Sequence, residues 1–232
     1  MEYDIDHRPS YALLTVELDR GEAVRSEAGA MVSHSPGIRV ETASTGGLVD
    51  SLKRSVLGGE SFFQNTFTAE EAGHVTLAPP LPGDVVHEPL DGRLLVQSGS
   101  FLAADTAIEL DTQFGGAKTF FGSEGLFLLE LQGQGPAFLA SYGAIDEVGL
   151  DAGEEYVVDT GHIVAFDGST DFSVTRVGGL KSTLFSGEGL VCRFTGPGRV
   201  FLQSRSQDAF LSWLVPNLPT GNDGDGFSIN VG

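Results

Sequence analysis

Cysteine is almost absent from this chain of 232 residues, and long apolar runs are missing altogether. The one cysteine, Cys192, excludes a disulfide within the chain. It lies in the strand-like run 190–194, which favours a small buried side chain over a reactive thiol. No apolar run approaches the roughly 20 residues that span a bilayer, and no signal peptide is visible. We therefore expect a cytoplasmic protein without stable membrane insertion.

Basic residues are also scarce. Thirteen lysines and arginines face 32 acidic residues, so the formal net charge is −19. A surface field of that sign repels phosphate backbones, which argues against nucleic acid as a partner. Acidic residues spread along the whole chain are typical of proteins adapted to a salt-loaded cytoplasm, as in halophilic archaea. Because the Debye length is about 3 Å at molar salt, we predict that stability rises with KCl concentration.

The motifs of common catalytic and metal sites are missing. The five histidines are scattered, with no His-x-His pair, no His-Glu-x-x-His and no cysteine pair at metal-ligand spacing. There is no Gly-x-Ser-x-Gly nucleophile turn, and the double glycines lack the frame of a phosphate-binding loop. The sequence therefore predicts no catalytic residue, no metal and no cofactor. A metalloenzyme with ligands far apart in the sequence stays open as an alternative.

A threefold internal repeat is present instead. Glu60, Glu124 and Glu188 stand 64 residues apart, since 124 − 60 and 188 − 124 both give 64. Each lies in a similar phrase, of the type Gly-Glu-Gly-Leu followed by an apolar run. Self-similarity at a fixed period determines architecture before any local pattern does.

A second phrase recurs upstream of each glutamate, with paired glycines seven or eight residues apart and a following apolar strand. It runs over residues 21–32, 92–102 and 153–164, and each copy leads to a double glycine before the glutamate. These landmarks divide the chain into a first unit at residues 1–82, a second at 83–146 and a third at 147–206. A helical segment at 207–216 and a polar tail at 217–232 follow. Units of about 65 residues are marginal alone, so we expect them to pack on one another.

Strand signals dominate the chain, since short runs rich in Val, Ile, Leu, Phe and Thr are bounded by glycine, proline and aspartate. Helix is predicted in only two places. One is residues 48–57; the other runs from Gln207 to Leu214 and is ended by Pro216. We expect this second helix to cap a sheet or form a subunit contact. A membrane-surface helix is the alternative, but it lacks the usual basic face.

The lysines form the most specific pattern. The chain has only three, Lys53, Lys118 and Lys181, one in each unit and six or seven residues before the repeat glutamate. One interpretation pairs each lysine with the glutamate of its unit as a structural ion pair. The other gathers the three lysines into a ring that holds an anion or a partner's acidic groups, since an ammonium differs from a guanidinium in what it binds.

The Gly-Gly turn, the Gly-Glu-Gly-Leu phrase and the Phe-Leu strand resemble a widespread bacterial and archaeal family that includes a fungal protein of the altered-inheritance-of-mitochondria type. The resemblance covers about residues 1–215. It implies an all-β fold of three tandem pseudo-symmetric units like the tryptophan-RNA-binding attenuator protein (TRAP), each a β-sandwich or short double-stranded β-helix. It also implies homo-oligomers, with a trimer favoured. It supplies no catalytic residues.

We therefore predict a non-enzymatic, oligomeric β scaffold or binding protein, whose ligand the sequence does not identify. The candidate site residues are the three lysines and the three repeat glutamates. The alternative is a cupin-like metalloenzyme or a sugar-binding barrel with dispersed site residues.

Overall fold

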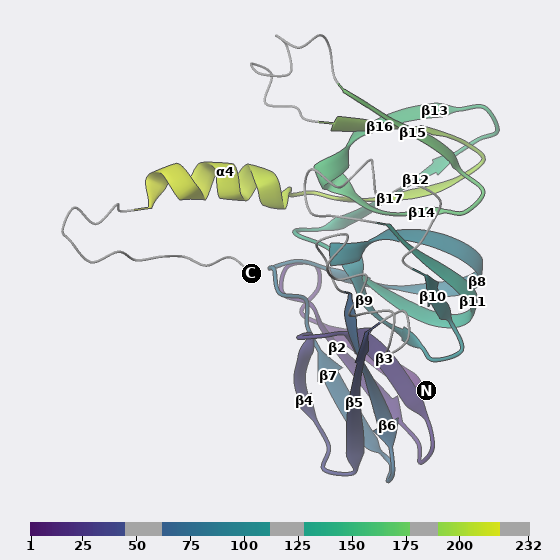
Figure 1. The fold of residues 1–232 in the computed structure, drawn as a ribbon, viewed down its shortest axis with the longest axis vertical. Helices are drawn as coiled ribbons and strands as arrows, with labels where there is room; N and C mark the ends of the chain where they lie inside the picture. The colour runs from purple at the N-terminus through teal and green to yellow at the C-terminus, as the bar shows by residue number, and fades with distance from the viewer. Residues whose placement is uncertain (45–61, 112–127, 177–189, 219–232) are drawn as a thin grey trace.

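The computed structural model describes residues 1–44, 62–111, 128–176 and 190–218. Within these ranges the chain is all-β, with one α-helix near its C-terminus, as the sequence predicts. Figure 1 shows the strands arranged along one long axis, with the N-terminal strands at one end and strands β13, β15 and β16 at the other.

The strands of the first predicted unit are β1 to β7: Glu2–Asp6, Leu13–Leu18, Ala23–Glu27, Met31–His34, Ile38–Ser44, Phe63–Ala69 and Gly73–Leu77. The second unit holds β8 (Val85–Gln97), the 3-10 turn η1 (Ser98–Ser100), β9 (Phe101–Asp105), β10 (Glu109–Asp111) and β11 (Leu128–Ala140). The third holds β12 (Ile145–Leu150), β13 (Glu155–Asp159), η2 (Thr160–His162), β14 (Ile163–Asp167), β15 (Asp171–Arg176), β16 (Leu190–Thr195) and β17 (Gly198–Gln203).

Antiparallel pairings recur in the same order along the chain. In the first unit β7 lies between β2 and β4, and β6 lies between β3 and β5. In the third, β17 lies between β12 and β14, and β16 between β13 and β15. In the second, the long strands β8 and β11 pair along their whole length, and β11 also pairs with β9 and β10. This recurrence supports the threefold division, which stays a prediction.

Each unit has a glycine with positive φ at the start of its repeat phrase. Gly92 lies inside β8 with φ of 119°. Gly21 and Gly153, with φ of 93° and 79°, lie in turns that separate two strands. Residues with a Cβ adopt this conformation only with strain, which explains why the repeat phrase begins with glycine. The sequence pattern does not reveal that β8 and β11 continue through their central glycines as single strands.

Two strand pairs join the units. Residues 24–26 of β3 pair with residues 103–105 of β9, and residues 94–96 of β8 pair with residues 165–167 of β14. These junctions build a ten-stranded sheet. Two smaller sheets remain, with strand orders β1-β2-β7-β4 and β13-β16-β15.

The core consists of three apolar clusters that follow one another along the chain. Burial alternates along the strands, as in β2, where Leu14, Val16 and Leu18 point inward and Thr15 and Glu17 do not. The largest buried side chains in the three clusters include Phe67 and Phe138, then Phe101, then Phe166 and Phe194. This supports the expectation that the predicted units pack on one another.

The C-terminal helix α4 spans Gln207–Asn217, three residues further than Leu214, because Pro216 fits inside its last turn. The Ser206 side chain caps its N-terminus by accepting a hydrogen bond from the Ala209 N–H, with an N···O distance of 3.4 Å. None of its residues is buried, and Figure 1 shows it projecting sideways from the strands. Phe210 packs against Tyr142, which lies between β11 and β12, with 6.0 Å between the ring centroids. The expectation that the helix caps a sheet or forms a subunit contact stays a prediction.

The prediction that strands dominate the chain is confirmed in the described ranges. The helix predicted at 48–57 lies outside the described residues. No helix in the described ranges is long and apolar enough to cross a membrane.

Candidate functional site

The six site residues predicted from the repeat lie outside the described residues. Lys53 and Glu60 fall in the range 45–61, Lys118 and Glu124 in 112–127, and Lys181 and Glu188 in 177–189. The double glycines fall in the same ranges. The ion-pair and anion-ring interpretations therefore both stay predictions.

The described residues enclose a different candidate, a cavity of about 420 Å³. The residues that line it come from all three predicted units and from the start of α4. They lie where β3, β8, β11 and β17 end, together with η1, η2 and the linker at residues 79–81. A volume of this size is in the range of small-molecule sites.

Gln97 is the most informative side chain in the cavity wall. It ends β8, its residue is 3% exposed, and its amide nitrogen Nε2 has no hydrogen-bond partner. The equivalent residue of the third unit, Asp159, caps η2 by accepting a hydrogen bond from the Gly161 N–H at 2.9 Å, but Gln97 makes no such bond to η1. A buried donor left unpaired costs roughly 1–3 kcal/mol. A ligand in the cavity that presents an oxygen would remove this cost.

Glu27 lies on the same wall, at the end of β3. Burial penalises its charged form and raises the pKa of the carboxyl to about 7. At neutral pH this carboxyl is therefore protonated in a large fraction of molecules and can donate a hydrogen bond as well as accept one. Glu27, Gln97 and Asp159 share one position in the repeated phrase.

The opposite wall is fixed by Gln203 at the end of β17. Its Oε1 accepts a hydrogen bond from the Tyr142 N–H and its Nε2 donates one to the Gly161 carbonyl, each at 2.9 Å. A Cβ added at Gly161 would lie 2.7 Å from the Ser206 hydroxyl, so glycine is needed where η2 approaches the start of α4. Both polar atoms of Gln203 are therefore paired, whereas the Nε2 atom of Gln97 is buried and unpaired.

The part of the cavity wall that the structure describes contains polar and apolar side chains but no basic side chain. Among the described residues, no lysine, arginine or histidine lines it, whereas Glu27 and Asp208 do. Apolar surface comes from the prolines and leucine at residues 79–81 and from Leu211. This arrangement fits a neutral molecule with hydroxyl or carbonyl oxygens better than an anion, because a wall with carboxylates and no cation repels negative charge.

Metal-ligating and nucleophilic groups do not gather elsewhere in the described ranges. No group of three or more His, Cys, Asp or Glu side chains there has the spacing of a metal site. Cys192 is fully buried, as predicted, and burial raises the pKa of its thiol to about 12. A thiol in that state is a packing residue.

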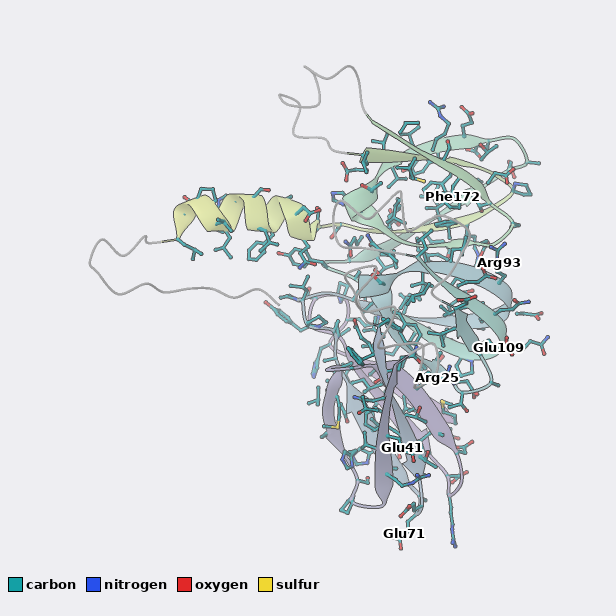
Figure 2. All side chains as sticks on the ribbon, in the orientation of Figure 1. Arg25, Glu41, Glu71, Arg93, Glu109 and Phe172 are labelled. Atoms are coloured by element: carbon teal, nitrogen blue, oxygen red, sulfur yellow. The ribbon has the colours of Figure 1, made fainter. Side chains whose placement is uncertain are left out.

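Charged groups concentrate at the junctions between the units. At the junction of the second and third, the Arg199 guanidinium donates to both carboxylate oxygens of buried Glu88, at 2.7 and 3.2 Å, and to Asp167. These carboxylates raise the pKa of Arg199, which stays charged. In Figure 2, Arg25 of the first unit lies lower than Arg93 of the second. Arg25 donates to the Ile108 carbonyl at 3.3 Å and so links β3 to the second unit.

Sequence reasoning missed Glu27 and Gln97 as site residues. The one available signal was their shared place in the repeat phrase, immediately before a turn with a glycine two residues later. From the sequence alone, an acidic residue or an amide at such a place cannot be told from a solvent-exposed turn residue. Whether its side chain is buried depends on segments that are distant in the sequence.

Two solved or curated proteins of Streptococcus pyogenes are similar to this chain. A protein known from an X-ray crystal structure matches with a TM-score of 0.78 and 28% identity, over 94% of this chain and 99% of that one. An uncharacterised protein of serotype M6 is 29% identical over 232 residues, 96% of this chain and 93% of its own length. Neither match bears on a halophilic source or on a TRAP-like unit.

The family profile described as mitochondrial biogenesis AIM24 matches residues 3–205, which is most of the chain and all three predicted units. The altered-inheritance-of-mitochondria resemblance seen in the repeat motifs is therefore confirmed. This chain belongs to the AIM24 family.

Proposed function

We propose that this protein is a non-enzymatic, oligomeric β scaffold that binds a small neutral polar molecule in the cavity beside Gln97. The observation that supports the proposal is the Gln97 amide nitrogen, buried in the cavity wall without a hydrogen-bond partner. Native proteins rarely leave such a group unpaired, so this atom calls for an explanation, and a bound oxygen atom would supply one.

The ligand class follows from the wall. A hydroxyl or carbonyl oxygen of the ligand accepts from Gln97, and its own hydroxyl groups meet the carboxyl of Glu27. The apolar residues at 79–81 cover the carbon skeleton. A sugar-like or polyol-like molecule has these groups and no negative charge.

The proposal includes assembly of identical chains in the cytoplasm, with a trimer favoured by the family resemblance, and unit folds of the TRAP-like kind. The exposed apolar side chains of α4 support assembly, since Trp213 and Val215 are 63% and 62% exposed. Such a patch is typical of an interaction surface.

The ligand class is tested by calorimetry with size-matched probes. Glucose and ribose represent neutral ligands, and gluconate and ribose 5-phosphate represent their anionic counterparts. We expect a neutral probe to bind and its anionic counterpart to fail. Binding should be lost in Gln97→Leu and kept in Gln64→Leu, which removes a second buried amide with an unpaired Nε2 that does not line the cavity.

Two results would contradict the proposal: preferential binding of the anionic probes, or unchanged binding by Gln97→Leu. Failure of every neutral probe to bind also counts against the ligand class. Elemental analysis tests the cupin-like metalloenzyme alternative, because stoichiometric iron, zinc or manganese in purified protein would favour that alternative over a non-enzymatic scaffold.

A further inference from the structure

Two strands at opposite ends of the chain lack the partner that their equivalents have. Strand β9 pairs with β3 of the preceding unit, and β14 pairs with β8 of the preceding unit. Among the described strands, the matching strand of the first unit, β4, pairs only with β7. At the other end, β13 matches β3 and the second half of β8, but within the described ranges it pairs only with β16.

The match between β4, β9 and β14 rests on a shared irregularity. Each pairs with the closing strand of its unit, β7, β11 or β17, and each skips one residue in that pairing. The skipped residues are Val32, Leu102 and Val164. An inserted residue at the same place in three strands fixes their alignment residue by residue.

The side chains at these matched positions are buried where a neighbouring unit pairs with the strand and exposed where no described strand of another unit does. Phe101 and Ile163, which begin β9 and β14, are completely buried, whereas Met31, which begins β4, is 42% exposed. On the other side of the junction, Leu95 is 1% exposed, but its equivalent in β13, Val157, is 49% exposed. The apolar residues at both free edges are therefore those that a neighbouring unit buries in the interior of the chain.

One of the two edges, β4, lacks the charges that protect other edge strands. Strands β1, β10 and β12 are edges too, and each carries two or three acidic residues within a few positions. Strand β4 (Met-Val-Ser-His) has no acidic or lysine residue, whereas β13 has Glu155 and Asp159 at its ends and the apolar centre Tyr156-Val157-Val158. Proteins usually place charge on an edge that must stay unpaired.

We propose that β13 of one copy pairs antiparallel with β4 of a second copy, and so repeats between chains the junction that joins units within a chain. The register follows from the two interior junctions, which agree with each other. The expected Cα partners are Tyr156 with Ser35, Val157 with His34, and Val158 with Ser33.

This contact uses different surfaces on the two copies, so it is head-to-tail. In Figure 1, β4 and β13 belong to the outermost units, with the second unit between them, so one chain does not close on itself through these strands. A head-to-tail contact gives either a closed ring or an open filament. The inference rests on the proposed oligomer and names the surface that forms it.

Disulfide trapping tests the register. Val157→Cys and His34→Cys are made in separate chains; the native Cys192 is buried and does not interfere. We expect the mixture of the two variants to form cross-linked heterodimers on oxidation, while each variant alone does not, since equivalent residues of two copies do not meet. In the control mixture His34→Cys is replaced by Val40→Cys, an exposed position on β5, which is an edge strand of a different sheet.

Equal cross-linking in the control mixture, or none in the Val157→Cys and His34→Cys mixture, would overturn the proposed edge pairing. Light scattering and probe binding on the same samples separate this failure from failure of the proposed function. If the oligomer binds the neutral probe but shows no register-specific cross-link, only the proposed edge pairing is refuted. If the expected cross-link forms but no probe binds, only the proposed ligand class of the cavity is refuted.

Discussion

Met31 in β4 and Phe101 in β9 occupy the same place, one residue before the skipped position of their strand, yet Met31 is 42% exposed and Phe101 is completely buried. Residues 103–105 of β9 pair with β3 and Phe101 packs on Phe62 of the first unit, whereas among the described strands β4 pairs with β7 alone. This pair of residues shows that the apolar surface left at the ends of the chain is of the kind that unit junctions bury.

Replacing either buried amide with leucine should stabilise the ligand-free protein. Gln97 and Gln64 are 3% and 5% exposed, and each has an Nε2 atom without a partner. Leucine removes the unpaired donor at similar volume, so we expect the free energy of unfolding to rise by about 1 kcal/mol for each variant. Urea unfolding measures this change, and a loss of stability in both variants would refute the assignment of these atoms as unpaired.

Glu27→Gln should change how stability depends on pH. Burial raises the pKa of Glu27 from its ordinary value of 4.5 to about 7, so the folded state holds this proton more tightly than the unfolded state. The contribution of this residue is fully present below pH 4.5 and is lost as pH rises to about 7. We expect the variant to match the wild type near pH 4 and to be more stable at pH 8, by at most about 3 kcal/mol.

Thermal unfolding of the two proteins from pH 4 to pH 8 measures this difference. Parallel curves over the whole interval would mean that Glu27 titrates normally.

The ion pair at the junction of the second and third units should matter far more than one on the surface. Arg199→Met leaves Glu88, 6% exposed, without its guanidinium, so we expect a loss of about 2–4 kcal/mol. The control Arg39→Met removes pairs with exposed Glu41 and Glu70, for which a loss of at most about 1 kcal/mol is expected. Similar losses in the two variants, measured by urea unfolding, would show that the junction gains nothing from Arg199.

The strands could be predicted from the sequence because their signal is local. Alternation in the β2 run and the Gly-bounded run of β5 identify strands without knowledge of their neighbours. The glycine landmarks also placed turns correctly, since Gly21 and Gly153 do adopt positive φ.

The candidate cavity could not be predicted, because it is formed by segments far apart in the chain. Gln97 shares the cavity wall with residues from η2, the 140–142 segment and α4, and no local pattern encodes that arrangement. The reverse holds for Lys53 and Glu60: their spacing is conspicuous in the sequence, but they lie outside the described residues.

Salt should stabilise this protein. A net charge of −19 in 232 residues produces repulsion between surface carboxylates, which ions screen. We expect the melting temperature to rise by several degrees between low salt and molar KCl. An unchanged melting temperature would remove the argument for adaptation to a salt-loaded cytoplasm.

The molar mass in solution tests the central claim most directly. Light scattering in molar KCl should give a multiple of the 24.4 kDa chain mass for the wild type. It should give 24.4 kDa for Val157→Lys and for Val32→Lys, because each places a charge on one free edge. The matched variant Val40→Lys, on the exposed part of β5, should keep the wild-type mass. A monomeric wild type, or an oligomer that survives both edge variants, would contradict assembly through β4 and β13.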